Sequence, residues 1–311
     1  LVIWGLQADS PGGRSLTGHT GEIGAVGFTP DSKRMISVST DRTARVWQLS
    51  DDPERDVVVL QHGDEVGQLA IAGDGRWLLT GTITAALLWD LQGPLDSPTA
   101  ELKGHEDDLK AVALDARGRW AATGSNDRKI ILYDLKKSTS KASAKLRRHE
   151  GAIQVLAFDP KGKWLASGSE DKTVRLWDLA SAHPDEGSLV LSGHEGGITD
   201  LEWSADGRWL VSSSNDGTLR LWDTRRPHAE MVEGAIVLEG HTALMPVPQV
   251  ALVSTESGMT GAVSVSYDGT VRLWPFESSK LIELACTAAG RRLTEDEWTE
   301  YVGGKQSSAC K

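Results

Sequence analysis

Five sets of histidine, serine or threonine, and aspartate recur along the chain, and each holds the residue types of a nucleophilic triad. In such a triad a histidine takes the proton of the serine hydroxyl while an aspartate orients the imidazole. The histidine precedes the aspartate by 22 residues in four sets and by 27 in the last, and a Trp or Tyr follows the aspartate by six. The sets are His19, Ser37, Asp41, Trp47; His105, Thr123, Asp127, Tyr133; His149, Ser167, Asp171, Trp177; His194, Ser212, Asp216, Trp222; and His241, Ser264, Asp268, Trp274.

The repetition of these sets argues against catalysis. A hydrolase needs one such set, opening on a pocket with an oxyanion site. The chain also has no HExxH motif, no Cys/His zinc spacing and no Gly-rich phosphate loop. We therefore expect no catalytic residue, no metal and no cofactor in this segment, and a structural role for the sets.

Short runs of alternating apolar and polar residues surround each set. In the clearest unit they are Ile153 to Phe158, Trp164 to Ser169 and Thr173 to Trp177. Turn residues, Pro160 to Gly162 and Glu170 to Lys172, separate them. This pattern predicts antiparallel strands in a meander. One such unit cannot bury both of its faces, so it needs neighbours.

A Trp or Tyr closes an equivalent unit seven times, at intervals of 42 to 45 residues and a last interval of 52. A period near 44 with four short strands per unit indicates propeller blades. The sequence therefore predicts an all-β fold. We expect a seven-bladed β-propeller, built of six full blades and the outer two strands of the first, with a short C-terminal helix. The closing residues are Trp4, Trp47, Trp89, Tyr133, Trp177, Trp222 and Trp274.

The Gly-His pairs that open several units and the Trp-Asp pairs that close them resemble those of WD-repeat proteins, over roughly residues 1 to 285. The closing pairs are Trp89-Asp90, Trp177-Asp178 and Trp222-Asp223. The resemblance implies a hydrogen-bond chain in each blade, from indole N–H to hydroxyl, hydroxyl to imidazole and imidazole to carboxylate. The five sets are thus predicted to be structural hydrogen-bond sets.

The predicted propeller spans residues 1–285 and a helical tail spans 286–311. Leu1 to Leu6 matches the third strand of a blade, so we expect the first two strands upstream of residue 1. Blade three has no aspartate in its second turn, which predicts a broken polar set and reduced stability. Extra residues, Met245 to Met259, interrupt blade seven. The predicted blades are 1–18 (partial), 19–61, 62–103, 104–147, 148–192, 193–239 and 240–285.

The tail has the signals of a short helix. Thr294 as N-cap with Glu297 three residues later forms a capping box. Trp298 and Tyr301 share one face, which we expect to pack on the propeller. The tail resembles the one that closes many bacterial multidomain WD-repeat proteins, in which the repeats follow an effector such as a STAND-type NTPase, a kinase or a protease. That resemblance implies a bacterial origin and an upstream effector.

Charge and cysteine content limit the partners. A net charge of −11 and a pI near 5.2 argue against a nucleic-acid binder. The two cysteines, Cys286 and Cys310, cannot form a disulfide framework, which favours a reducing compartment. No apolar run is long enough to span a membrane, and no signal peptide is visible. These features predict a cytoplasmic protein with no nucleic-acid or membrane partner.

The loops before the first strands and the second turns share one face of a propeller, and here they are acidic. This predicts a binding face for a protein or a basic peptide, or for an upstream domain of the same chain; the alternative is ordinary solvated loops. The basic stretch Lys136 to Arg148 is either a solvated loop or a contact for an acidic partner. The candidate face residues are Glu22, Thr40, Glu65, Asp107, Asp108, Asn126, Glu150, Glu170, Glu195, Asn215 and Tyr267.

The predicted function is a non-catalytic protein–protein interaction platform. We expect it to be the sensor or regulatory C-terminal domain of a larger bacterial signalling or effector protein. One alternative is a stand-alone cytosolic scaffold. Another is a propeller-type hydrolase, which would need a metal or a carboxylate cluster on the ring axis.

Overall fold

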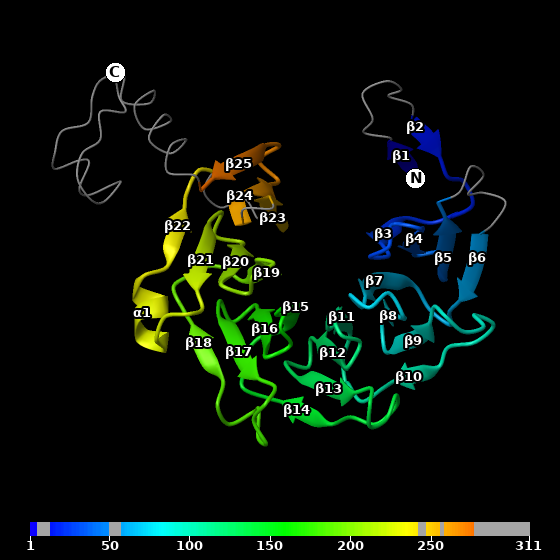
Figure 1. Ribbon diagram of the computed structural model, residues 1–311, viewed down its shortest axis with the longest axis horizontal. Helices are drawn as coiled ribbons and strands as arrows, with labels where there is room; N and C mark the ends of the chain where they lie inside the picture. The colour runs from blue at the N-terminus through cyan, green and yellow to red at the C-terminus, as the bar shows by residue number, and fades with distance from the viewer. Residues whose placement is uncertain (5–12, 50–56, 242–246, 256–257, 277–311) are drawn as a thin grey trace. The chain divides into compact units, whose positions relative to one another are not determined.

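The computed structural model describes residues 1–4, 13–49, 57–241, 247–255 and 258–276 (Figure 1). Among these residues the fold is all-β, with one two-stranded sheet, six antiparallel sheets of three or four strands and one helix. The all-β class and the blade-sized sheets predicted from the sequence are confirmed. The predicted helical tail, 286–311, and the last residues of the predicted blade seven, 277–285, lie outside the described residues.

The chain divides into two compact units, Leu1–Leu201 and Glu202–Lys311, which are described separately. In the first unit, each complete blade places four strands side by side in chain order. The partial blade is β1(Val2–Trp4) and β2(Gly13–Ser15); blade two is β3(Ile23–Phe28), β4(Arg34–Ser39), β5(Thr43–Gln48) and β6(Val57–Gln61); blade three is β7(Val66–Ile71), β8(Trp77–Thr82), β9(Ala86–Asp90) and β10(Ala100–Leu102); blade four is β11(Leu109–Leu114), β12(Trp120–Ser125), β13(Ile130–Asp134) and β14(Ala144–Leu146); blade five is β15(Ile153–Phe158), β16(Trp164–Ser169), β17(Val174–Asp178) and β18(Leu189–Leu191).

The second unit repeats the pattern with two additions. The chain enters it within β19(Ile198–Trp203) and continues through β20(Trp209–Ser214), β21(Leu219–Asp223), α1(His228–Glu233), β22(Ile236–Leu238), β23(Gln249–Thr255), β24(Gly258–Val265) and β25(Val271–Pro275). The helix α1 was not predicted; it buries Met231. The extra residues of blade seven lengthen the hairpin of β23 and β24, which pairs Gln249 with Val265 and Thr255 with Gly258.

In blades two to six the second strand lies between two others and is almost wholly buried. Small residues in this strand let the next blade approach. A Cβ atom on Gly124 in β12 would lie 2.6 Å from Ile153 Cγ2 in β15, so no larger residue fits there without a shift. The third-strand rings Trp47, Trp89 and Trp177 are each at most 2% exposed. Burial of these large rings contributes on the order of 2–3 kcal/mol each.

No helix of the described part of the chain is long and apolar enough to cross a membrane.

Candidate functional site

The repeated polar set forms a continuous hydrogen-bond chain in blade five. Trp177 Nε1 donates to Ser167 Oγ at 2.8 Å, and Ser167 Oγ lies 2.7 Å from His149 Nε2. His149 Nδ1 lies 2.7 Å from Asp171 Oδ2. An indole can only donate and an ionised carboxylate can only accept. The serine hydroxyl therefore donates to Nε2, and the histidine is the neutral tautomer that carries its proton on Nδ1.

Burial and hydrogen bonding shift the pKa in opposite directions for each of the two titratable groups, His149 and Asp171, of this hydrogen-bond chain. Burial lowers the pKa of His149, which favours the neutral ring despite the neighbouring Asp171. Burial alone would raise the pKa of Asp171, but hydrogen bonds from His149, Thr173 and the Glu150 N–H hold that pKa well below its usual value. These pKa shifts favour a neutral imidazole and an ionised carboxylate, and the hydrogen bonds accommodate both.

Blades two and seven repeat this arrangement. His19 lies 2.8 Å from both Asp41 and Ser37, and Trp47 Nε1 donates to Ser37 at 2.9 Å. The bonds of the last set are similar. They join Trp274, Ser264, His241 and Asp268 at 2.9, 2.7 and 3.0 Å. In blade six Trp222 Nε1 donates to Ser212 at 2.9 Å, and His194 is buried.

Blade four retains only part of the hydrogen-bond chain. His105 contacts Asp127 at 3.1 Å and Thr123 at 2.9 Å. The Tyr133 hydroxyl, however, donates to the Lys103 carbonyl at 3.2 Å. Burial raises the pKa of Tyr133 to about 12, so this phenol stays protonated and remains a donor.

Blade three retains more of the set than its sequence predicts. Thr80 accepts from Trp89 Nε1 at 3.0 Å and lies 2.8 Å from His62 Nε2. The Leu60 carbonyl, 3.1 Å from His62 Nδ1, takes the place of the missing carboxylate. The prediction of a broken set is therefore correct only for its acidic end. Sequence reasoning missed Thr80 because it precedes its Trp by nine residues, where the other blades have ten.

These sets offer no reactive group to a substrate. Ser37 and Ser167 have no exposed surface, and their hydroxyls bond the neighbouring histidine and tryptophan. In the part of the chain that the structure describes, no group of three or more His, Cys, Asp or Glu residues is arranged to hold a metal ion. The sets can tie the second and third strands to the loop before the first strand.

Three residues of the predicted binding face meet at one pocket. Thr40, Glu65 and Asp108 come from blades two, three and four and line a hollow of about 140 Å³. Ile83, in the short second turn of blade three, also lines it and is 39% exposed. The pocket therefore combines an apolar side chain with two carboxylates and the ammonium group of Lys110.

The carboxylates of this face differ in how far they are neutralised. Lys110 Nζ lies 3.9 Å from Asp108, and the Glu170 carboxylate accepts from the Gln154 amide at 2.8 Å. Within the described residues, five of the predicted carboxylates take part in no ion pair: Glu22, Glu65, Asp107, Glu150 and Glu170. Three cations that follow the turn aspartates have left-handed backbone conformations, with φ of 65° to 71°: Arg42, Arg128 and Lys172.

Four further candidates do not line this pocket. Asn126 is half-buried and its N–H donates to the Asp108 carbonyl at 2.9 Å. Glu195 is exposed in the first unit. Asn215 and Tyr267 are exposed in the second unit, where the Tyr267 side chain reaches 71%. The basic stretch forms the connection that contains β14, and the Arg147 N–H donates to Asp185 at 2.7 Å.

Comparison with known families decides what this repeated geometry is. The model of the WD domain, G-beta repeat, matches residues 13–48, 96–134, 140–178 and 187–223. These four segments are repeats of the WD40 type. Each match covers the outer strand of one blade and the first three strands of the next, with the polar set that those three strands carry.

The WD40 relatives include subunits of several assemblies. The chain is 28% identical to guanine nucleotide-binding protein subunit beta-1 of Nicotiana tabacum, over 41% of this chain and 36% of that protein. It is 30% identical to target of rapamycin complex subunit wat1 of Schizosaccharomyces pombe, over 30% and 29%. It is 28% identical to small ribosomal subunit protein RACK1 of Neurospora crassa, over 36% and 37%. The matches thus span 29% to 37% of each relative's length.

In blades three and six the aspartate of the Trp-Asp pair, at the end of the third strand, binds an arginine. Arg76 pairs with Asp90 at 2.8 Å and stacks over Trp77, and Arg208 does the same with Asp223 at 2.9 Å and Trp209. In blade five Lys163 lies over Trp164, 4.7 Å from the ring centroid. These stacks lie opposite the acidic loops along the strands, because the first turn and the second turn of a meander lie at opposite strand ends.

Proposed function

We propose that this WD40 domain is a non-catalytic platform that binds a basic segment of a protein partner at its acidic loops. The pocket formed by Thr40, Glu65 and Asp108 carries the proposal, since three consecutive blades contribute to it. The unpaired carboxylate of Glu65 would attract lysine or arginine, and Ile83 would contact an adjacent apolar side chain. The names of the relatives support the class, because each describes a subunit or component of an assembly.

We further propose that the domain acts in the cytoplasm as the sensor or regulatory part of a larger signalling protein. The support is the resemblance of the tail to that of bacterial multidomain proteins. The relatives named above come from a plant and from fungi, so the bacterial setting rests on the tail alone. Sequencing the complete reading frame, and finding whether an effector domain precedes the repeats, tests this part.

Charge reversal tests the acidic loops. We expect short peptides in which arginine flanks a leucine to bind the domain, and to bind more weakly as salt rises. Glu65→Lys with Asp108→Lys should abolish this binding. The matched control reverses two exposed carboxylates elsewhere, Asp96→Lys with Glu101→Lys. Equal binding by the two double variants would refute the assignment of this face.

A further inference from the structure

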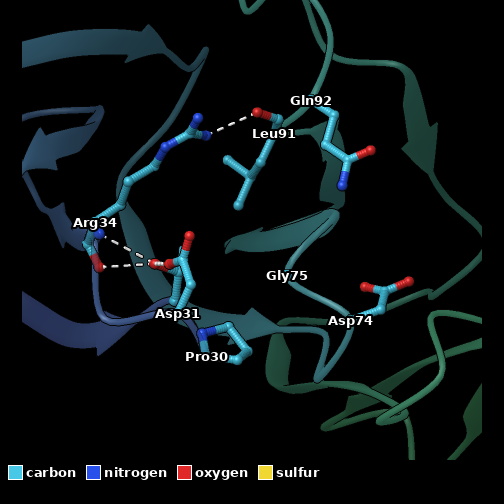
Figure 2. Close-up of a pocket in the computed structure, with 8 residues that line it drawn as sticks. Pro30, Asp31, Arg34, Asp74, Gly75, Leu91 and Gln92 are labelled. Carbon is cyan, nitrogen blue, oxygen red and sulfur yellow. Dashed lines mark hydrogen bonds between the residues drawn. The ribbon is translucent and has the colours of Figure 1, made fainter.

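A second pocket lies in the first unit at the other end of the strands from the acidic loops. It opens between the β3–β4 turn of blade two and the β7–β8 turn of blade three, and its volume is about 480 Å³ (Figure 2). Its lining includes Pro30, Asp31, Arg34, Asp74, Leu91 and Gln92. Since none of these residues lines the pocket of the proposed function, the two sites can be tested independently.

The pocket lies where the other blades carry a tryptophan. In blades three to six the first residue of the second strand is a Trp that pairs with the aspartate of the third strand, as Trp77 pairs with Asp90 and Trp120 with Asp134. In blade two the same register position holds Arg34, paired with Gln48. Blade two therefore has different residues at both positions of the pair.

The tryptophan fills the space between consecutive blades. Trp77 shares a hydrophobic core with Leu135 of the next blade, and Trp120 shares one with Leu179. Leu91 is the equivalent leucine in blade three, since each of the three follows the strand-ending aspartate. Arg34 does not fill this space. Its Nη1 instead donates to the Leu91 carbonyl at 2.7 Å, which holds the side chain against one wall (Figure 2).

The charges of the lining suit a ligand group that carries a single positive charge. Asp31 and Asp74 contribute two negative charges from separate turns, against the single positive charge of Arg34. Asp31 Oδ1 accepts from Thr29 Oγ1 at 2.6 Å and from the Lys33 N–H at 3.1 Å. The first of these bonds is the main cause that lowers the pKa of Asp31, so the carboxylate is anionic at neutral pH.

Several polar atoms of the lining remain available. In the described part of the chain, neither Asp31 Oδ2 nor the side-chain amide of Gln92 makes a hydrogen bond. Pro30 is exposed and provides apolar surface beside them, whereas the Leu91 side chain is buried and contributes its carbonyl. The pocket thus offers carboxylate and amide acceptors next to an apolar wall, in a space that a planar indole fills at the other blade junctions.

We propose that this pocket binds the arginine side chain of a protein partner. The guanidinium is planar like the missing indole and carries five N–H donors, which suit a carboxylate and an amide oxygen together. Its aliphatic stem would lie on Pro30. Asp31, Asp74 and Gln92 are exposed, so the pocket admits a side chain that projects from a larger partner.

Titration calorimetry with blocked tripeptides tests the proposal. Acetyl-Gly-Arg-Gly-amide is expected to bind, whereas the same peptide with citrulline, which has the shape without the charge, is not. Arg34→Trp should restore the arrangement of the other blades, fill the pocket and abolish binding without lowering the unfolding temperature. Asp31→Asn should weaken binding about tenfold, as expected for the loss of a charge-assisted hydrogen bond.

Two control variants test whether the peptide binds at this pocket and not elsewhere on the domain. Asp206→Asn changes the carboxylate at the equivalent position of blade six and should leave binding unchanged. Glu65→Lys with Asp108→Lys, which disables the acidic loops, should leave it nearly unchanged. Binding that survives both Arg34→Trp and Asp31→Asn would overturn the proposal. Tighter binding of free L-arginine than of the blocked peptide would also overturn it, because the pocket would then be a small-molecule site.

Discussion

Replacing Asp171 with alanine should destabilise blade five strongly. The carboxylate accepts four hydrogen bonds, from His149 Nδ1 at 2.7 Å, the Glu150 N–H at 2.9 Å, the Thr173 N–H at 2.9 Å and the Thr173 hydroxyl at 2.6 Å. The His149 side chain is 1% exposed, so water cannot replace its lost acceptor. An orphaned buried donor costs about 1–3 kcal/mol and each of the other bonds about 0.5–1 kcal/mol, which gives roughly 3–5 kcal/mol in all.

The assay combines thermal unfolding with native-state hydrogen exchange. At about 2–4 °C per kcal/mol for a unit of this size, the unfolding temperature should fall by roughly 10 °C. A repeat array can open in parts, so amide exchange in β15–β17 should accelerate more than in β11–β13.

The neighbouring residue Glu170 provides the control for this substitution. It carries the same charge in the same turn, but its carboxylate accepts only from the exposed Gln154. Glu170→Ala should therefore change stability by less than about 0.5 kcal/mol. If the free energies of unfolding of Asp171→Ala and Glu170→Ala differed by less than about 0.5 kcal/mol, the hydrogen-bond chain would not be a source of stability.

Three further predictions follow from the same contacts. Burial lowers the pKa of His62, His105 and His149, so below about pH 6.5 the unfolded chain binds protons that the native chain does not. Stability to urea should therefore fall between pH 7.5 and 5.5, by up to ~1.4 kcal/mol per pH unit for each histidine, and a flat profile would contradict this. Thr80→Val should cost about 2–4 kcal/mol, because it leaves Trp89 and His62 without their shared hydroxyl; an unchanged melting temperature would count against that bond. Arg208→Ala removes a half-exposed ion pair and a stack on Trp209, and should cost only about 1 kcal/mol by urea unfolding; a loss above ~3 kcal/mol would show that this stack is a core contact.

The repeat period made the strands predictable. The runs Ile153 to Phe158 and Trp164 to Ser169 coincide with β15 and β16, because alternation and turn residues agree there. The helix α1 was missed, since six residues are too few to show a helical period. The bond from Tyr133 to the Lys103 carbonyl joins residues 30 apart and leaves no local pattern. Only the packing of the strands brings such groups together.

The candidate sites were predictable to the extent that they depend on repetition. Each hydrogen-bond set is visible in the sequence because a buried hydroxyl, imidazole and carboxylate need one another in every blade. A binding surface has the opposite property. Ile83 lies where other blades carry a charged or polar turn residue, and Arg34 lies where they carry a tryptophan. The exchange at Arg34 removes a core contact that blades three and four make, and both exchanged residues line a pocket. In a repeat protein the shared residues therefore maintain the fold, and the positions where one blade departs from its neighbours are where recognition should be sought.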